Sequence, residues 1–290
     1  MSESEQSVSE IVDAAMVHVS RLATLPEISV RILSLVEDPD SSAEDLEVLV
    51  SSDAVLSARV LKVVNSAFYG MPSEVATIQQ AIVMLGFGGL KSIVLAASLA
   101  KLFRGGSIDE SFNAQDLWSH SAAVGAAAKL LADEIGMDGG EMFLTGLMHD
   151  VGIVVEIQAS RTGFVEVIKA RAENPPETFG ETEARILGAT HEDFGLGLAR
   201  KWNFPPAMQA AVGNHHHPER AEGDARRIAS LICVADHLAA LAEIGYVGTV
   251  AGSPFPTDAA EFLGISESVL DNVRAALPET ASQANVLGAE

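Results

Sequence analysis

Apolar residues recur every three or four positions along most of this chain, and few segments alternate between apolar and polar as a half-buried strand does. Pro26 suits the first turn of a helix, and an apolar stripe follows it from Ile28 to Val36. Ser42, Asp53 and Thr77 each stand where a helix-capping side chain is expected. The pattern therefore predicts an almost all-α protein.

Breaks in the pattern set the expected limits of the helices. Asp38-Pro39-Asp40 ends one helix, and Gly86-Phe87-Gly88-Gly89 interrupts another. In the first part of the chain, helices are predicted at 9–22, 26–37, 43–52, 54–65, 78–85 and 90–103. In the second part they are predicted at 116–135, 141–149, twice within 151–173, and at 182–187, 191–202, 206–213, 224–242 and 266–276.

This order predicts two packed helical sub-bundles. Residues 1–8 are expected to form a disordered tail, 9–106 an N-terminal sub-bundle, and 107–245 a second sub-bundle with a candidate metal site. Residues 246–290 are expected to form a loop, a helix and a disordered tail, with at most a short strand pair between Gly245 and Pro256. Only Arg104-Gly105-Gly106-Ser107 separates the two sub-bundles, so they are expected to pack as one unit.

Composition narrows the possible partners. The chain has 290 residues, 48% of them hydrophobic, and its formal net charge is −22. Such a surface repels phosphate backbones and anionic lipids, so neither nucleic acid nor membrane is expected as a partner. The acidic, Ser-rich N-terminus lacks the features of a signal peptide, and the apolar stretches are too short to span a bilayer, which predicts a cytoplasmic protein. Cys233 is the sole cysteine and is expected to be a buried thiol.

Histidines and aspartates suggest the chemistry. His149-Asp150 ends an apolar stretch, and Asp236 falls in an apolar helix, where an unpaired carboxylate is costly. Imidazole nitrogen together with carboxylate oxygen suits iron, manganese, nickel or zinc, and Asp150 could bridge two ions. The candidate metal ligands are His120, His149, Asp150, His191, His215, His216 and Asp236.

Each of these residues also has a simpler explanation. A single histidine is more often a satisfied surface or core residue than a ligand, Asp236 could form a buried salt bridge, and His217 is expected to be exposed. Asn65, Ser66 and Tyr69 are expected to cap and pack a loop. Nothing in the sequence alone shows that the candidate ligands converge in space.

The order His, His-Asp, His, His-His, Asp on a helical scaffold resembles the HD superfamily of metal-dependent phosphohydrolases. Over residues 15–245 the chain resembles one branch of it, the HDOD domain of bacterial signalling proteins. The first sub-bundle carries the motifs Leu25-Pro26, Asp53-Ala54-Val55-Leu56-Ser57-Ala58-Arg59-Val60-Leu61, Val64-Asn65-Ser66-Ala67-Phe68-Tyr69-Gly70, Ile78-Gln79-Gln80-Ala81-Ile82 and Leu85-Gly86. The second carries Trp118-Ser119-His120-Ser121, Gly146-Leu147-Met148-His149-Asp150-Val151-Gly152, Glu183, His191-Glu192-Asp193-Phe194-Gly195, Trp202-Asn203-Phe204-Pro205, His215-His216-His217-Pro218 and Val234-Ala235-Asp236.

The chain departs from its relatives at three places. Ala54 replaces the usual Pro after Asp53. Ile153 stands where relatives that cleave cyclic dinucleotides carry Lys, and Pro218-Glu219-Arg220 replaces their Gly-Tyr-Pro loop. These differences make a cyclic-di-GMP phosphodiesterase an unfavoured interpretation.

The resemblance implies three alternatives. The favoured one is a signalling output or adaptor domain with a retained metal site, which binds a sensor kinase, a response regulator or a cyclic-dinucleotide enzyme. The loop Phe68-Tyr69-Gly70-Met71 is its candidate contact surface. The second is a phosphohydrolase acting on a nucleotide or phosphate ester, with one or two metal ions and Asp150, together with a metal-bound water, as the catalytic group. The third is a domain that senses a nucleotide ligand without turnover.

Overall fold

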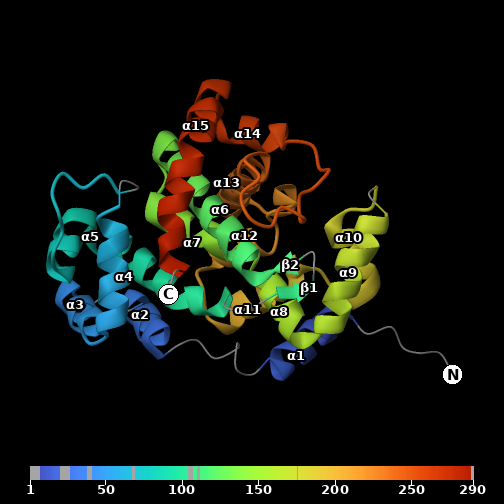
Figure 1. Cartoon of the computed structure of the whole chain (residues 1–290), viewed down its shortest axis with the longest axis horizontal. Helices are drawn as coiled ribbons and strands as arrows, with labels where there is room; N and C mark the ends of the chain where they lie inside the picture. Colours follow the sequence, from blue (N-terminus) through green and yellow to red (C-terminus); the bar gives the residue numbers. More distant parts are fainter. Residues whose placement is uncertain are drawn as a thin grey trace.

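The computed structural model describes residues 7–19, 27–37, 41–66, 69–103, 107–109, 112–174 and 176–288. These residues form an almost entirely helical protein, as the sequence predicts (Figure 1). The first helices are α1 (Val8–His18), α2 (Glu27–Glu37), α3 (Ala43–Ser51), α4 (Ala54–Val64) and α5 (Ile78–Leu99), followed by the short 3-10 helix η1 (Ala100–Phe103). Two short strands that the sequence did not predict, β1 (Ser107–Asp109) and β2 (Phe112–Asn113), pair antiparallel.

The remaining elements are helical. They are α6 (Ala114–Ile135), α7 (Gly139–Met148), α8 (Val151–Ala159), α9 (Arg161–Glu173), α10 (Phe179–Leu187), α11 (His191–Lys201), α12 (Pro206–Val212), η2 (Pro218–Arg220), α13 (Gly223–Leu241), α14 (Thr257–Leu263), α15 (Glu267–Ala284) and η3 (Asn285–Gly288). The segment between Gly245 and Pro256 is a loop without a strand.

Local chemistry explains the helix limits. The amides of Val55 and Leu56 both donate to the Asp53 carboxylate at 3.0 Å, which caps α4. Ser42 and Asp45 form the expected reciprocal capping box at the start of α3. Gly86 has a φ of 74°, in the left-handed region, and kinks α5 where the glycine-rich stretch predicted a break.

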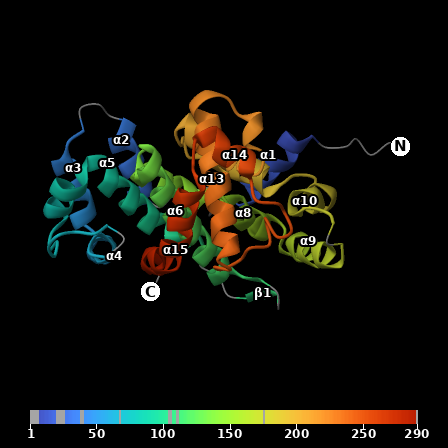
Figure 2. The ribbon, with the colours of Figure 1, turned by 90° about the horizontal axis from the view of Figure 1, so that it is seen from above.

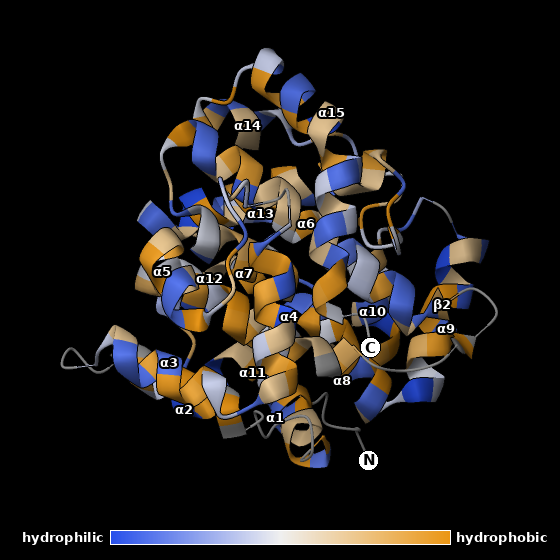
Figure 3. Ribbon diagram, turned by 60° about the vertical axis from the view of Figure 1, so that its left-hand side comes forward, coloured by the Kyte–Doolittle hydropathy of each residue, from blue (hydrophilic) through white to orange (hydrophobic). Residues whose placement is uncertain are grey.

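Two parts of the chain share one apolar core. Helices α2 to α4 and the first half of α5 lie together on one side of the molecule, and α6, α7 and α13 occupy its centre (Figures 1 and 2). The second half of α5, from Leu90 to Leu99, is buried except for the half-buried Lys91, and it packs against α7. Colouring by hydropathy shows the apolar positions of α7 at the centre of the molecule (Figure 3). The α5–α7 contact therefore joins the two sub-bundles.

Among the described residues, the main contacts of helix α1 lie outside the first sub-bundle. The helix lies against α8 and α11 of the second. A Cβ on Gly197 would come within 2.4 Å of Val12 Cγ1, so a glycine on α11 leaves the space that α1 fills. Lys201 Nζ also donates to the Met16 carbonyl oxygen at 3.2 Å.

The expectation of a disordered tail after Ala276 is wrong for residues 277–288. Helix α15 continues through Pro278 to Ala284 and packs along α6. Proline removes one helical hydrogen bond, but burial of Leu277, Ala281 and Leu287 favours the continued helix. The Trp118 indole donates to the Asn285 carbonyl oxygen at 3.3 Å, which fixes the start of η3 against α6.

Two stretches within the described residues are long and apolar enough, by composition, to cross a membrane. They are Ile78–Leu99, half of whose apolar window is buried, and Gly139–Ala159, for which the buried share is 83%. The first is kinked at Gly86, and the second comprises α7 and α8 and is broken at His149-Asp150. Core helices of soluble proteins show the same properties, so these stretches are weak evidence for a span.

Candidate metal centre

His149 and Asp150 lie at the junction of two buried helices. His149 caps the C-terminus of α7, and Asp150 precedes α8. The chain turns at this point, so both side chains point into the interior and not along a continuous helix. A Cβ on Gly152 would lie 1.8 Å from the His191 carbonyl oxygen. Helices α8 and α11 therefore meet backbone to backbone, which brings His191 to Asp150.

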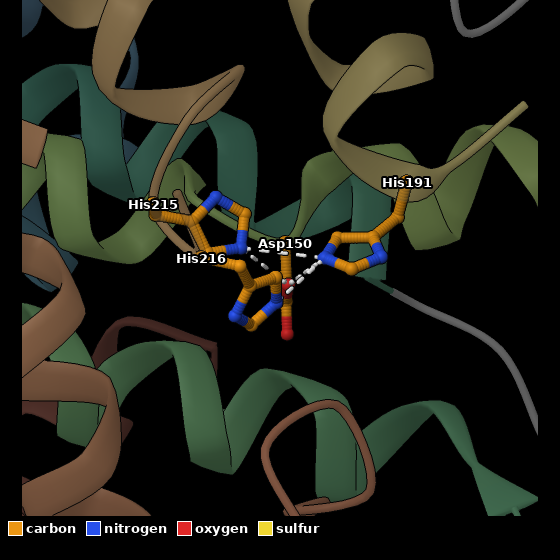
Figure 4. Close-up of side chains that lie close together, drawn as sticks. All are labelled: Asp150, His191, His215 and His216. Carbon is orange, nitrogen blue, oxygen red and sulfur yellow. Dashed lines mark hydrogen bonds and ion pairs between the residues drawn. The ribbon is translucent and has the colours of Figure 1, made fainter. Parts of the chain in front are cut away.

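The first group of donors surrounds one oxygen of Asp150 (Figure 4). The Nε2 atoms of His191 and His215 each lie 3.5 Å from Asp150 Oδ1, and His216 Nε2 lies 3.0 Å from His191 Nε2. All four residues offer a donor atom within 4.8 Å of the others, a spacing that one metal ion could satisfy.

A second group shares the same aspartate. His120, His149 and Asp150 also offer donor atoms within 4.8 Å of one another, and His149 Nε2 lies 3.2 Å from Asp150 Oδ2. Asp236 joins this group because its Oδ1 lies 2.9 Å from His120 Nε2. The seven candidate ligands from the sequence thus lie together, in two groups that meet at Asp150.

Hydrogen bonds on the outer side of the imidazole rings set their tautomers. The Nδ1 atoms of His149 and His215 donate to the carbonyl oxygens of Gly146 and Val212, at 2.7 and 2.9 Å. His191 Nδ1 lies 2.8 Å from the Glu183 carboxylate. A carbonyl oxygen can only accept, so Nδ1 carries the proton and the Nε2 lone pair faces inward. This is the arrangement of a metal-binding histidine.

The inward-facing atoms fit a cation. The Nε2 atoms of His191 and His215 face each other at 3.3 Å, and two lone pairs at that distance repel unless a proton or metal lies between or beside them. Within the described residues, the carboxylate oxygens of Asp150 have only the ion-pair contacts given above, and Asp236 Oδ2 and His149 Nε2 form no hydrogen bond. Buried donor atoms without hydrogen bonds, gathered in two groups, are what one or two divalent metal ions would bind.

Charge at the centre also favours metal binding. Burial alone would raise the pKa of Asp150, but the facing His149, with His215 and His191, holds that pKa well below its usual range. Burial would likewise raise the pKa of Asp236, and the bond to His120 lowers it overall. Burial, together with the neighbouring His215 and His191, lowers the pKa of His216 well below its usual value. Two carboxylates and a neutral imidazole are the protonation states that ligands need. Burial lowers the pKa of His120 and of His215, but contacts with Asp236 and Asp150 raise it overall, so a metal would displace protons from these two rings.

The centre is closed to solvent. Six of the candidate ligands have no exposed surface, and only His216 is partly exposed. The adjoining Ile153 is buried and apolar, in the place where dinucleotide-cleaving relatives carry a lysine. A substrate could therefore reach the centre only after movement near His216.

Three glutamates that the sequence analysis did not assign to the site support it from outside. Glu183 holds His191 as described above, and the Glu192 carboxylate accepts the His216 amide proton at 2.9 Å. Glu156 is buried in α8, and burial, followed by the charge of Glu183, raises its pKa well above the usual value. A carboxylate inside the apolar run Val154-Val155-Glu156-Ile157 was the available signal, the same one that identified Asp236.

Glu156→Gln is expected to stabilise the protein at neutral pH. An acid with a raised pKa binds more protons folded than unfolded, so its effect on stability is neutral at low pH and turns unfavourable as pH rises above about 4.3. An amide removes that cost. The gain should approach the order of 1 kcal/mol at pH 8, or about 2–4 °C in Tm, and vanish near pH 4. Thermal unfolding across this pH range measures it.

The exposed Glu166 on α9 offers the matched control. Glu166→Gln changes charge equally and should leave Tm within about 1 °C at every pH. A Glu156→Gln protein that is less stable than wild type at pH 8 would show that Glu156 is charged in the fold.

The other expectations from the sequence have clear outcomes. His217 is exposed and Cys233 is buried, as predicted. The Asn65 side chain bonds to the backbone of Leu61 and Val75, so it caps the loop as expected. Leu25-Pro26 and Phe68 lie outside the described residues.

Known proteins share this helical architecture. Residues 22–218 match the family described as HDOD domain. The crystal structure of an HDOD domain protein of unknown function from Geobacter sulfurreducens superposes with a TM-score of 0.73 at 26% identity, covering 94% of this chain and 99% of that one. A candidate phosphohydrolase from Shewanella amazonensis gives 0.74 at 26% identity, covering 95% and 97%.

A curated relative is longer than this chain. An uncharacterized protein from Treponema pallidum is 26% identical over 222 residues, which are 74% of this chain and 42% of that protein. The chain thus matches less than half of the length of this relative.

Proposed function

Since this chain belongs to the HDOD domain family, we propose that it is a signal-transduction output domain that acts through protein contacts and holds a divalent metal in its HD core. One observation carries the proposal: a complete set of metal donors is present but sealed from solvent. A complete donor set accounts for a retained metal. A centre closed to solvent gives substrate no access, so the metal's role would be structural and not catalytic. The metal then fastens α6, α7, α11 and α13 together around Asp150.

The donor set limits which metal fits. Five imidazoles and two carboxylates favour iron, manganese, nickel or zinc over calcium or magnesium. His191, His215 and His216 would hold one ion with Asp150, and His120, His149 and Asp236 would hold a second with the same aspartate. One or two ions are therefore proposed.

The first sub-bundle supports the contact role. Large apolar side chains stand exposed on consecutive helices there: Val48 on α3, Val55 on α4, and Val83 on α5, which is 79% exposed. We therefore place the proposed protein contact on this lobe, where a partner would cover these side chains. The partner classes proposed are a sensor kinase, a response regulator or a cyclic-dinucleotide enzyme, in the cytoplasm.

Partner binding and metal content should respond to different variants. Val83→Glu is expected to weaken binding to purified members of these partner classes at least tenfold, with unchanged metal content and Tm. His149→Ala should lower metal content and Tm, and should affect binding only as far as folding suffers. Biolayer interferometry and elemental analysis measure the two effects. The adaptor role fails if no member of the three classes binds the wild-type protein.

A second candidate function is phosphoester hydrolysis on a nucleotide or phosphate ester. The observation favouring it is that both donor groups share Asp150, which would let the seven candidate ligands hold two metal ions. Such a pair would supply a water activated for attack on phosphorus. Asp150 would then hold the reacting centre together, and substrate would enter beside His216.

A panel of phosphate esters and nucleotides separates the alternatives. Turnover by the metal-loaded protein that is lost in Asp150→Asn would establish the hydrolase. A nucleotide that raises Tm without being consumed would establish a sensing domain instead. The adaptor proposal expects neither result.

A further inference from the structure

A cavity of about 720 Å³ lies between the two sub-bundles, away from the metal ligands. Helix α5 lines one side, α7 another, and the stretch from Asn203 to Gln209 a third. Its volume is in the range of small-molecule sites, which often form between packed units of a protein. No metal ligand lines it.

The wall of the cavity is apolar with charge on one side. Leu95, Leu144, Phe204 and Met208 supply buried apolar surface. Lys91, Asp138 and Glu141 are the ionisable residues of the lining. This combination suits a ligand with an apolar body and one charged group.

The charged residues carry one more negative charge than positive. Asp138 caps α7 by accepting the Glu141 amide proton at 2.9 Å. The Glu141 carboxylate is half-buried and forms no hydrogen bond or ion pair among the described residues. Burial, followed by the charge of Asp138, raises the pKa of Glu141, and the charge of Lys91 offsets part of this rise. Lys91 is half-buried too, and burial lowers its pKa. A cation beside Glu141 would relieve this excess of negative charge.

We propose that this cavity binds a small organic cation, a protonated amine on an apolar or aromatic body, with its ammonium at Glu141 and Asp138. An anion would meet Lys91 but would also face two carboxylates on a protein of net charge −22. The amine's apolar body lies against Leu144, Phe204 and Met208.

Two helices connect the cavity to the metal centre. Helix α7 begins at the cavity with Glu141 in its first turn and ends at His149. Helix α12 begins at Pro206, also in the cavity wall, and leads to His215 and His216. A molecule bound in the cavity that moved the start of α7 or α12 would also move the metal ligands that follow the other end of that helix. The cavity is therefore suited to a small molecule that regulates the metal centre.

Three matched probes test the proposal on the full chain: phenethylamine, the neutral 2-phenylethanol and the anionic 3-phenylpropanoate. Isothermal titration should show saturable 1:1 binding of the amine, at least about tenfold tighter than the alcohol, with the carboxylate weakest. Glu141→Gln should weaken binding of the amine until its affinity equals that of the alcohol. Glu134→Gln, an equal charge change on the exposed face of α6, should leave binding unchanged.

A second variant tests the location. Gly88 is an exposed glycine of the cavity wall, and a Cβ there would meet no atom within 4 Å, so Gly88→Phe adds a bulky side chain at the cavity with no clash at its Cβ. It should abolish amine binding with Tm preserved. The proposal is overturned if no probe binds at millimolar concentration, if the carboxylate binds best, or if amine binding survives both Glu141→Gln and Gly88→Phe. None of these outcomes depends on metal binding or on the adaptor role.

Discussion

Gly152→Ala should destabilise the protein severely and abolish metal binding. A methyl group there would lie 1.8 Å from the His191 carbonyl oxygen and 2.8 Å from the Gly195 amide nitrogen. Both are backbone atoms of α11, so no side chain can rotate away. Helices α8 and α11 must separate, and His191 moves away from Asp150. A loss of more than about 4 kcal/mol in unfolding free energy is expected, measured by urea denaturation with elemental analysis of the soluble protein.

Gly180 supplies the matched control. It lies in the first turn of α10, and a Cβ there would meet only the Thr190 methyl group, at 3.8 Å. Gly180→Ala should therefore be neutral or stabilise by up to about 1 kcal/mol, because alanine restricts the unfolded chain. If Gly152→Ala unfolds at the same urea concentration as wild type, the backbones of α8 and α11 are not in direct contact at Gly152.

Short-range signals in the sequence predicted most of the fold. Asp53 and Thr77 cap helices because a side-chain oxygen two or three residues before an amide satisfies it locally, without any distant partner. Gly86 marks a kink for an equally local reason. Helix α15 shows the limit, since Pro278 is a local stop signal that tertiary burial of Leu277 and Leu287 overrides.

In the metal centre, too, local features were predictable from the sequence and long-range packing was not. Buried charge in an apolar run identified Asp150 and Asp236 from sequence, because the cost of burying a carboxylate is local information. Their convergence with His191 depends on the close crossing of α8 and α11, which no spacing along the chain encodes. Glu156, like Asp236, is a carboxylate inside an apolar run, but it belongs to none of the motifs that marked the candidate ligands. Its place behind His191 is clear only from its position beside Glu183 in the structure.

Asp150→Asn should remove both metals at once. Asp150 is the only residue common to the two donor groups, and asparagine keeps its shape while losing the charge that each ion needs. A protein saturated at a thousandfold excess over Kd loses about 4 kcal/mol of metal-derived stability with its ions. Elemental analysis and Tm, each measured with and without chelator, report the change. Chelator should lower the wild-type Tm and leave that of Asp150→Asn unaltered.

Single-group variants show whether the centre holds two ions. His216→Ala alters only the first group, and His216 is partly exposed, so the fold should tolerate the change. His120→Ala alters only the second group and leaves Asp236 without its partner at 2.9 Å. With two ions bound, each variant should keep about one equivalent while Asp150→Asn keeps none. If His216→Ala loses as much metal as Asp150→Asn, and His120→Ala loses none, the centre holds one ion among Asp150, His191, His215 and His216, and the carboxylate of Asp236 serves only to hold His120.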